Sequence, residues 1–455
     1  MRELLSFHRI IIVDMTHGGK ILAEELKKKW EVVGIDVYDT MDPEEVAQFK
    51  LNGIQIIKSL NEISLKNSDT IIAPVHCNPQ FLSKAIEKKK KIISFHKIVG
   101  NLLRSELKDK FIIEITGTHG KSTTTITLAK LLSYQYKVLC LSSRGLELFQ
   151  NGSSEYLKKE IEIAPPYLLH VKKYLQEFDI GIFEISLGGI GLADIGVLTN
   201  IIEDYPIANS TKNASHGKKQ LIEFAKKNSV IFYNSDDKNS KKLINDIKTE
   251  ATLISFGETG QIRGNIIDLV NFNKHNNLEI VYDFFFKDNK KGKINSSISG
   301  KVIGPGYFYA TLTYVGVALI LKINKNKIIE NLYDFNGIQN RLNLSKMNDC
   351  WILNDINSGV GDISLEAALK SISSYLTTNN CKIWLIFDAN TLVCEGIDID
   401  KIQRIISKWK NIIADVYSTN LNMGKSFLDL NKLINDLCEK ARKNDIIFIT
   451  KKVKG

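Results

Sequence analysis

Apolar and polar positions in the first hundred residues predict strands and helices that follow one another along the chain. Three apolar runs predict buried strands: "RIIIVDM" (9–15), "EVVGIDVY" (31–38) and "DTIIAPV" (69–75). Between the first two, "ILAEELKKKW" (21–30) has the apolar spacing of an amphipathic helix, and the loop "THGGK" (16–20) joins strand to helix. Strands that alternate with helices indicate a parallel sheet, so we expect a Rossmann-like unit here.

The loop of this first unit has two interpretations. Asp36 ends the next strand about twenty residues after the loop, a spacing found in dinucleotide-binding folds, but no GxGxxG motif is present. Gly18 and Gly19 therefore either form a tight strand-to-helix turn or bring the backbone close to a phosphate or carboxylate. The turn is the simpler interpretation.

A second unit begins with "KFIIEITGTHGKSTTTITLAKLL" (110–132), which predicts a buried strand, a Gly/Thr loop and a helix. The strands "FDIGIFEIS" (178–186) and "ADIGVLTNI" (193–201) follow, and this alternation again indicates a mostly parallel sheet. Residues 251–302 are richer in strand patterns, and we expect a hairpin whose turn is the lysine-rich "KDNKKGK" (287–293).

A third unit begins near "GIQNRLNLSK" (337–346). Its predicted strands are "WILND" (351–355), "KIWLIFDA" (382–389) and "DIIFITKKV" (445–453), and "SLEAALKSIS" (364–373) predicts a helix. A length of 455 residues fits about three domains of ~150 residues. We therefore predict three α/β domains, with ranges 1–109, 110–337 and 338–455.

No membrane or secretion signal is expected. The longest apolar run, "YFYATLTYVGVALIL" (307–321), is shorter than the ~20 residues of a membrane span, and it predicts a buried helix. The first residues contain only a short apolar run before an acidic residue, which does not match a signal peptide. Six cysteines without CxxC pairs favour reduced thiols in a cytoplasm: Cys77, Cys140, Cys350, Cys381, Cys394 and Cys438.

The net charge of +10 favours an anionic partner. Lysines are spread along the chain, and no motif for nucleic-acid binding is present, so nucleic acid is the weaker interpretation. A small-molecule polycarboxylate explains the charge equally well. The pattern does not distinguish a monomer from a small oligomer.

The segment "EITGTHGKSTT" (114–124) is the main candidate for chemistry. Gly120, Lys121 and Ser122 fit a P-loop, but the position five before Gly120 is Ile115, and the other glycine, Gly117, comes only three residues earlier. The setting between a buried strand and a helix is the one a phosphate loop requires. A helix N-cap rich in Ser and Thr is the alternative, but such a cap does not require Gly-x-x-Gly-Lys.

This loop is expected to bind ATP. Backbone N–H groups would surround the phosphates at the positive end of the helix dipole, with Lys121 on the β- and γ-phosphates and a Ser122 or Thr123 hydroxyl on Mg²⁺. The predicted nucleotide-binding residues of the loop are Gly117, Thr118, His119, Gly120, Lys121, Ser122 and Thr123.

Magnesium needs further oxygen ligands. Glu184 ends the strand 178–186, and Asp204 follows the next strand. Because parallel strands end at one edge of a sheet, we predict Ser122, Glu184 and Asp204 as metal ligands, with Glu203 as an alternative to Asp204.

Several segments together resemble the Mur ligase superfamily from residue 110 to about 375. In chain order they are "GTHGKSTT", "FEIS", "TNIIED", "NSDD" (234–237), Arg341 and "LNDINSGVGDISLEAAL" (353–369). Each piece is weak alone, but the set is specific, and these ligases use a shortened GTxGK[ST]T loop. The resemblance implies an N-terminal substrate domain, a central P-loop ATPase domain, and a C-terminal Rossmann-like domain that closes over the nucleotide.

The resemblance also assigns residues outside the loop. Arg341 and Asp355 would contact the ATP phosphates or ribose. Lys219 falls where some members carry a carbamylated lysine that helps to bind Mg²⁺. Lys218 fits that position equally well, and an ordinary surface lysine is the simpler interpretation. The implied catalytic residues are Lys121, Glu184, Lys219 and Arg341.

The chain departs from the superfamily pattern at two places. Asp204-Tyr205 replaces an Asp-His pair whose His serves a second Mg²⁺, and "GYFYATLT" (306–313) lacks two Asn residues that lie near the nucleotide. We therefore expect the second metal site and the adenine contacts to differ. His216, in the loop that follows, is either a substrate contact or a solvated histidine.

The N-terminal segments are similar to the methanogen branch of the superfamily, the coenzyme F-430 synthetases. That resemblance implies an ATP- and Mg²⁺-dependent ligase that activates a carboxylate as an acyl phosphate and closes the carbocyclic ring of a nickel tetrapyrrole. The first alternative is a Mur-type amide ligase in pseudomurein or other peptide synthesis. The second is a P-loop ATPase that acts as a switch or a nucleic-acid motor, although "IFEIS" ends in Glu and no motor motif accompanies it.

Overall fold

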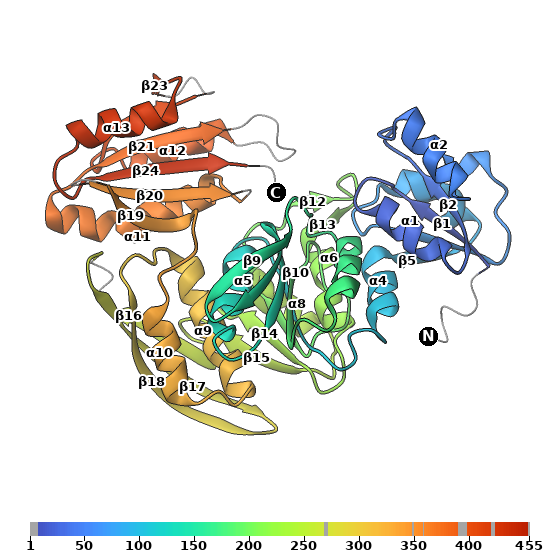
Figure 1. Ribbon diagram of the computed structural model, residues 1–455, viewed down its shortest axis with the longest axis horizontal. Helices are drawn as coiled ribbons and strands as arrows, with labels where there is room; N and C mark the ends of the chain where they lie inside the picture. Colours follow the sequence, from blue (N-terminus) through green and yellow to red (C-terminus); the bar gives the residue numbers. More distant parts are fainter. Residues whose placement is uncertain are drawn as a thin grey trace. The chain divides into compact units, whose positions relative to one another are not determined.

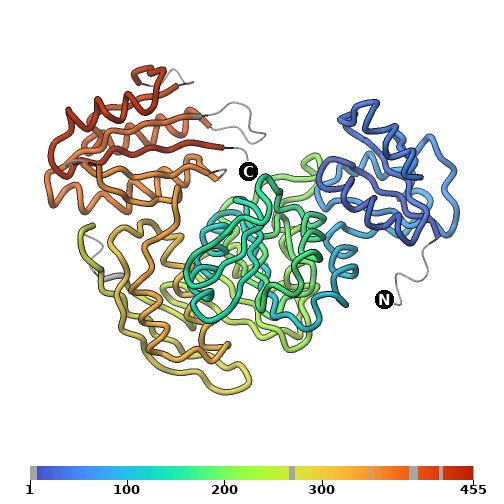
Figure 2. The backbone as a smooth tube through the Cα atoms, viewed as in Figure 1, coloured from blue at the N-terminus to red at the C-terminus, as the bar shows by residue number. Residues whose placement is uncertain are grey.

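The computed structural model describes residues 8–267, 272–347, 350–357, 359–389, 398–419 and 424–453. The first seven residues and Cys394, which entered the sequence predictions, lie outside the described residues. The chain forms two compact units, which Figure 2 traces by residue number. One comprises Met1–Thr125 and Gln135–Ser255, and the other comprises Ile126–Tyr134 and Phe256–Gly455.

The first sheet has five parallel strands in the order β3-β2-β1-β4-β5. Its strands are β1 (Arg9–Val13), β2 (Glu31–Ile35), β3 (Gln55–Ile57), β4 (Asp69–Ala73) and β5 (Lys91–Ser94). Its helices are α1 (Gly19–Lys27), α2 (Pro43–Leu51), α3 (Ser83–Glu87), α4 (Phe95–Leu103) and the short 3₁₀ turns η1 (Leu60–Glu62) and η2 (Pro79–Leu82). The parallel α/β order confirms the Rossmann-like prediction.

Both faces of this sheet are covered, which explains why its strands are continuous apolar runs. Along β1, Ile10 and Ile12 pack into one apolar cluster, whereas Ile11 and Val13 pack into another. At the turn into α1, Gly18 has φ 82°, and a Cβ on Gly19 would lie 2.1 Å from the Asp14 carbonyl oxygen. The geometry therefore supports the interpretation of these glycines as a tight strand-to-helix turn.

The second sheet has a parallel centre, with strands in the order β14-β11-β6-β10-β7, and the antiparallel strands β8 and β9 beyond β7. Its strands are β6 (Phe111–Thr116), β7 (Val138–Ser142), β8 (Gly145–Gln150), β9 (Ser153–Lys158), β10 (Ile180–Glu184), β11 (Ile195–Leu198), β14 (Val230–Asn234) and β15 (Thr252–Phe256). The remaining elements are α5 (Lys121–Leu132), η3 (Pro165–Tyr174), β12 (Pro206–Ile207), β13 (Lys212–Asn213), α6 (Ala214–Lys218), α7 (Gln220–Glu223) and α8 (Lys238–Asp246).

A long hairpin follows in the second unit, and Figure 2 shows its two strands side by side. The elements here are β16 (Ile262–Ile267), β17 (His275–Phe286), β18 (Asp288–Ser299), α9 (Pro305–Ile320) and α10 (Lys325–Asp334). The expectation that 287–293 forms the turn is wrong, because Phe286 pairs with Asp288 and the chain reverses at Lys287. The other lysines belong to β18, where Lys291 lies opposite Asp283 and their charged groups are 3.0 Å apart.

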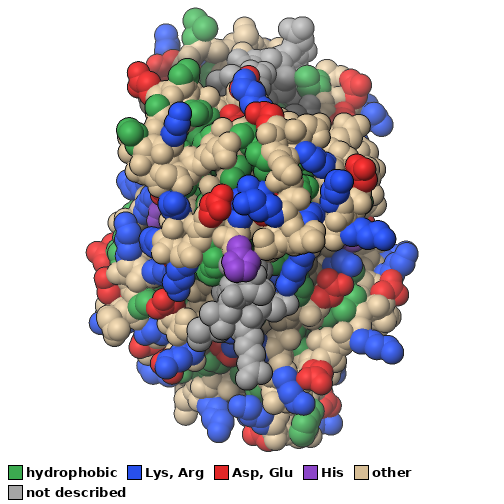
Figure 3. Space-filling view, turned by 90° about the vertical axis from the view of Figure 1, so that its right-hand side faces the viewer, with side chains coloured by type: hydrophobic (Ala, Val, Ile, Leu, Met, Phe, Trp, Pro, Cys, Tyr) green, Lys and Arg blue, Asp and Glu red, His purple; other side chains and the backbone are tan. Residues whose placement is uncertain are grey.

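Helix α9 coincides with the predicted buried helix, and ten of its residues are buried. Across the part of the chain that the structure describes, no helix combines the length and the apolar character that crossing a membrane requires. On the face shown in Figure 3, Lys and Arg side chains lie among Asp and Glu side chains, so that face carries no continuous basic patch.

The third sheet has the order β19-β20-β24-β21-β22-β23, parallel except for the antiparallel pair of β19 and β20. Its strands are β19 (Arg341–Met347), β20 (Cys350–Asn357), β21 (Ile383–Ala389), β22 (Ile413–Ser418), β23 (Lys425–Ser426) and β24 (Ile446–Lys452). Helices α11 (Asp362–Asn379) and α12 (Ile399–Lys408) pack on one face and α13 (Leu430–Lys440) on the other (Figure 1).

The α/β fold class predicted from the sequence is confirmed. Each of the three predicted domain ranges contains one main sheet, although the boundaries at 109/110 and 337/338 stay predictions.

Candidate active site

The strand, loop and helix expected of a phosphate-binding segment are present. β6 ends at Thr116, α5 begins at Lys121, and residues 117–120 connect them. β6 lies between β10 and β11 in the parallel sheet. Since parallel strands end at one edge of a sheet, the loop, Glu184 and the segment after Leu198 all emerge at that edge.

The two glycines of the loop meet different surroundings. Gly117 has φ 149°, and a Cβ there would lie 1.9 Å from Thr199 Oγ1. Gly120 has φ 75°, and a Cβ there would meet no atom within 4 Å. Glycine is thus required at position 117 because Thr199 of the same chain approaches it closely. Gly120 adjoins open space, which a phosphate group bound to the backbone would occupy.

Asn200, a residue without a predicted role, holds the loop in place. Its Oδ1 accepts hydrogen bonds from Thr118 Oγ1 at 2.8 Å and from the His119 backbone N–H at 3.0 Å. Its Nδ2 donates to the His119 carbonyl oxygen at 3.1 Å, and its own carbonyl oxygen accepts from the Thr118 N–H at 2.9 Å. Thr199 Oγ1 donates to the same His119 carbonyl at 2.7 Å. Contacts within the chain therefore fix the loop conformation.

Ser122 and Glu184, two predicted metal ligands, are in contact. The Ser122 hydroxyl donates to Glu184 Oε1 at 2.9 Å and lies 3.0 Å from the Ser143 hydroxyl. The Ser143 backbone N–H donates to Glu184 Oε2 at 3.1 Å. Glu184 is 1% exposed, and it takes part in no ion pair among the described residues. A buried carboxylate beside a hydroxyl and without a cationic partner fits the oxygen ligands that Mg²⁺ prefers.

Lys121 and Thr123 lie in the first turn of α5 and are half-buried. The Lys121 Nζ is 3.3 Å from the Thr118 carbonyl oxygen, so the side chain lies back along the loop. No acidic residue occupies the first turn of this helix. The positive end of its dipole is consequently available to an anion.

The two acidic residues after β11, Glu203 and Asp204, have different hydrogen-bond partners. Asp204 accepts two hydrogen bonds from Ser215, from its backbone N–H and its hydroxyl, both at 2.7 Å. Glu203 Oε2 lies 2.9 Å from Nε2 of His119 in the loop. Of the two carboxylates, Glu203 is the one in contact with the loop, and the metal-binding role of Asp204 stays a prediction.

The two candidate lysines, Lys218 and Lys219, lie in different surroundings. Lys219 forms an ion pair with Glu223 at 3.0 Å on the surface of a short helix. Lys218 is 1% exposed, and its Nζ lies 5.7 Å from the centre of the Tyr205 ring. A role that needs a buried, desolvated amine therefore suits Lys218 better than Lys219. His216 lies in α6 rather than in the loop expected from the sequence, and its exposure agrees with a solvated histidine.

Arg341 and Asp355 belong to the second unit, whereas the loop belongs to the first. They face each other in the register of β19 and β20, and their contact with a nucleotide stays a prediction. Asp355 is 5% exposed, and burial raises its pKa to about 6, although Arg341 and a hydrogen bond from Asn357 act in the opposite direction. The positions of both residues are set by the third sheet, to which β19 and β20 belong.

Sequence reasoning missed Asn200, Thr199 and Ser143. The signal for the first two is the "TN" directly after the strand next to β6, because a polar pair at that sheet edge must face the loop. Ser143 follows β7, whose partner β10 ends at Glu184, but the sequence does not reveal that pairing.

Comparison with known proteins gives three consistent results. Residues 115–304 match the Mur ligase middle domain. The chain is 29% identical over 418 residues to coenzyme F(430) synthetase of Methanosarcina acetivorans, and 25% identical over 411 residues to the enzyme of that name from Methanocaldococcus jannaschii. Each alignment covers 88% of this chain and 88% of the relative.

More distant relatives include peptidoglycan enzymes. The chain is 23% identical over 358 residues to UDP-N-acetylmuramate–L-alanine ligase of Dictyoglomus turgidum, which covers 77% of this chain and 69% of the relative. Among solved structures, the fold is similar to MurF ligase from Thermotoga maritima in complex with ADP, with a TM-score of 0.59 and 15% identity. That similarity covers 99% of this chain and 95% of the other.

Proposed function

We propose that the chain is an ATP-dependent ligase of the Mur ligase superfamily, and that it closes the carbocyclic ring of a nickel tetrapyrrole, the coenzyme F-430, from its seco-acid precursor. The observation that carries the proposal is the similarity to two coenzyme F(430) synthetases over 88% of this chain. Because each alignment leaves out only 12% of the chain, it must extend into the range 1–109, in which a substrate domain is expected. The proposed reaction converts ATP to ADP and phosphate.

The loop between β6 and α5 is the proposed ATP site. The N–H groups of Thr118 and His119 already donate to Asn200, so the backbone N–H groups of Gly120 and Lys121, together with the Lys121 ammonium group, would hold the phosphates. Because Asn200 fixes the loop beforehand, little backbone ordering has to accompany nucleotide binding. Arg341 and Asp355 are proposed as further nucleotide contacts on the basis of the sequence resemblance.

Ser122 and Glu184 would hold Mg²⁺, which supplies charge neutralisation at the γ-phosphate. Ser143 would position Glu184, because its backbone N–H donates to the oxygen that Ser122 does not contact. Asp204 and a carbamylated Lys219 stay in the proposal as additional ligands from the resemblance. Lys218 replaces Lys219 if carbamylation requires burial.

The chemistry follows from the poor electrophilicity of a carboxylate. A substrate carboxylate oxygen attacks the γ-phosphorus, the bond to the β,γ-bridging oxygen breaks, and ADP leaves. The resulting acyl phosphate has a good leaving group. A carbon atom of the macrocycle then attacks the acyl carbon, loses its proton, and displaces phosphate as the six-membered ring closes.

The charge of the chain agrees with such a substrate. A net charge of +10 attracts a molecule with several carboxylates at long range. The scattered rather than clustered lysines in Figure 3 favour a small anion over a nucleic-acid strand on that face. We further propose that the protein is cytoplasmic and acts as a monomer or a small oligomer.

A second candidate is a Mur-type ligase that joins an amino acid through an amide bond. The similarity to a UDP-N-acetylmuramate–L-alanine ligase over 77% of this chain favours it. The two candidates share the activation step and differ in the nucleophile, which is carbon in one and an amine in the other.

Release of ADP by the purified protein separates these candidates. With ATP and Mg²⁺, we expect the nickel seco-acid to stimulate ADP release and to be converted to a product lighter by one water. Amino acids with a UDP-muramyl acceptor should give no stimulation. Stimulation by the amino acid alone, with none by the seco-acid, would show that the chain is an amide ligase.

A further inference from the structure

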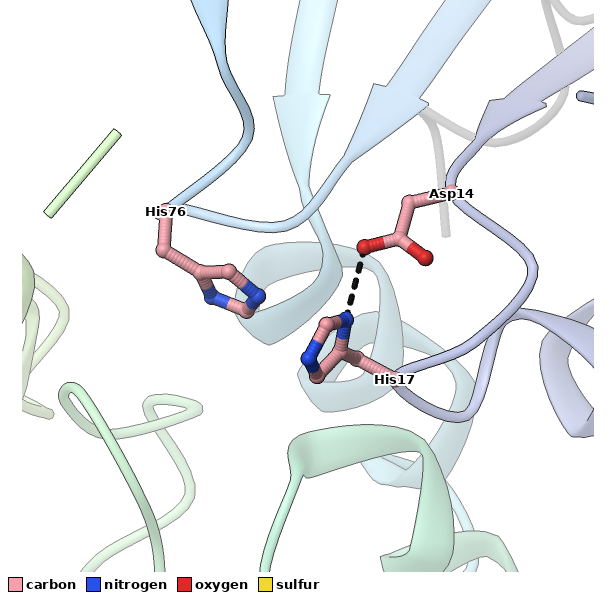
Figure 4. Close-up of side chains that lie close together, drawn as sticks. All are labelled: Asp14, His17 and His76. Carbon is pink, nitrogen blue, oxygen red and sulfur yellow. Dashed lines mark hydrogen bonds and ion pairs between the residues drawn. The ribbon is translucent and has the colours of Figure 1, made fainter. Parts of the chain in front are cut away.

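A cluster of metal-binding side chains lies in the N-terminal sheet, away from the ATP loop. Asp14 directly follows β1, His17 lies in the turn before α1, and His76 lies in the loop after β4. Each offers one ligand atom, and these atoms lie within 4.8 Å of one another. Figure 4 shows the three side chains directed toward one another from the ends of two adjacent strands.

Asp14 orients the first imidazole. His17 Nδ1–H donates to Asp14 Oδ2 at 2.7 Å, while the other carboxylate oxygen accepts from the Thr16 backbone N–H at 2.8 Å and from its hydroxyl. Asp14 is fully buried and has φ 82°, an unusual backbone conformation for a residue with a side chain. When the ring is neutral, this arrangement leaves a lone pair on Nε2 of His17, and histidines that bind metals commonly donate their other N–H to a carboxylate in this way.

The second imidazole has an unsatisfied nitrogen. His76 Nε2 is buried and has no hydrogen-bond partner among the described residues. The His76 and His17 rings meet edge to face, with centres 4.5 Å apart. A buried polar atom without a partner is costly, and it calls for a ligand that the protein itself does not supply.

We propose that Asp14, His17 and His76 form a binding site for a divalent first-row transition-metal ion. His17 and His76 donate imidazole nitrogens, and Asp14 orients His17 or adds an oxygen ligand. Metal–nitrogen distances of about 2.0–2.1 Å place neighbouring ligand atoms roughly 3–4 Å apart. Small side-chain rotations bring atoms that lie within 4.8 Å to that spacing.

The ligand set determines the class of ion. Imidazole with carboxylate suits Ni²⁺, Zn²⁺, Cu²⁺ and Fe²⁺ rather than Mg²⁺ or Ca²⁺, which prefer oxygen ligands. The neighbouring Cys77 is not among the residues whose ligand atoms lie within 4.8 Å of one another, and its thiol donates to the Asn78 carbonyl oxygen at 3.7 Å. Since two imidazoles cannot complete a coordination shell, the ion keeps open positions.

The ion has two possible sources that share this chemistry. It is either a free ion or the metal centre of a larger substrate, and the second source rests on the proposed function. His17 is 43% exposed in its side chain, so the cluster is accessible from that side.

Titration of the metal-stripped protein with Ni²⁺ alone tests the free-ion source without ATP. We expect one strongly bound ion per chain, with at least tenfold weaker binding in His17→Ala and His76→Ala. His170→Ala, which removes a half-buried histidine of η3, and Lys121→Ala should bind Ni²⁺ like the unmodified protein. Unchanged binding in both cluster variants would overturn a free-ion site here.

The second arm uses the nickel seco-acid and its metal-free form, again without ATP. If the metal comes with the substrate, the visible spectrum of the nickel compound shifts on binding, the metal-free form binds more weakly, and His76→Ala abolishes the shift. Absence of both Ni²⁺ binding and a His76-dependent shift would overturn the proposal.

Two controls keep these outcomes interpretable. The Co²⁺ absorption spectrum of the unmodified protein reports nitrogen coordination without any substitution, and a spectrum free of nitrogen ligation contradicts the site even if a variant misfolds. If the unmodified protein binds the metal but does not close the ring, the proposed function is refuted and the metal site is not.

Discussion

Gly117 and Gly120 lie three residues apart in one loop, and each is glycine for a different physical reason. Gly117 leaves room for Thr199 of the adjacent segment, whereas Gly120 adopts a left-handed conformation beside open space. The usual explanation of a phosphate loop, that small residues let the backbone touch phosphate, therefore applies to Gly120. Gly117 serves the packing of the loop itself.

Alanine at each glycine should separate these two roles. Gly117→Ala should lower the free energy of unfolding by about 2–4 kcal/mol, because its methyl group meets Thr199. Gly120→Ala should cost only about 1–2 kcal/mol but weaken ATP binding at least tenfold. Urea unfolding and calorimetric titration with a non-hydrolysable ATP analogue measure the two effects. Normal nucleotide affinity in Gly120→Ala would contradict the assigned site.

A second prediction for a single residue concerns Asn200. Asn200→Ala removes three side-chain hydrogen bonds that fix Thr118 and His119, so the loop must be ordered by the nucleotide instead. We expect a rise of about tenfold or more in the Kd for the ATP analogue, with a small change in the unfolding midpoint. Asn245→Ala, on an exposed position of α8, is the matched control and should bind like the unmodified protein.

At the scale of elements, the strand, loop and helix around 110–132 could be predicted because each has a local signal: an apolar run, a Gly-rich break and a helical pattern. The contacts of Asn200 and Ser143 could not, since they depend on which strands are neighbours. The segment 287–293 was wrongly predicted to be a turn because it is rich in lysine. Lysines of β18 in this segment instead form ion pairs with acidic residues of β17. Charge on an edge strand also discourages further pairing.

The pairing of β19 and β20 predicts a pH dependence. The pKa of Asp355 is about 6 in the folded protein, above its ordinary value of 3.8, so between these values the folded state keeps a proton that the unfolded state releases. The free energy of unfolding should therefore fall as the pH rises from 4 to 6, by at most about 3 kcal/mol.

Asp355→Asn should flatten this dependence, and Asp436→Asn, on the exposed side of α13, should not. Urea unfolding followed by tryptophan fluorescence is a suitable readout, since three of the four tryptophans belong to this unit: Trp351, Trp384 and Trp409. An equal slope in all three proteins would show that Asp355 does not carry the proton.

For the molecule as a whole, three main sheets among the described residues and a similarity over 88% of the chain agree with the proposed ligase better than with an isolated ATPase module. The amino-acid pattern predicted the fold class and a resemblance to the Mur ligase superfamily, because both rest on many positions. The substrate depends on a few side chains, and the sequence alone did not single out the cluster of Asp14, His17 and His76.

Lys121→Ala tests the ATP site in the complete protein. The substitution removes the cation expected at the β- and γ-phosphates, so turnover of ATP should fall below detection while the circular dichroism spectrum and the Tm stay unchanged. Arg341→Ala should reduce turnover less severely. Lys241→Ala, at an exposed position of α8, serves as a comparison and should turn over ATP like the unmodified protein. ATP turnover at the normal rate in Lys121→Ala would refute the role of the loop.

The most direct test of carboxylate activation follows the oxygen atom that the mechanism transfers. The seco-acid, labelled with ¹⁸O in its reacting carboxylate, is incubated with the protein, ATP and Mg²⁺, and the released phosphate is examined by ³¹P NMR. Because the carboxylate oxygen that attacks phosphorus leaves with it, we predict one ¹⁸O atom in each phosphate formed from fully labelled substrate. Product formation with unlabelled phosphate would contradict the acyl phosphate and the mechanism built on it.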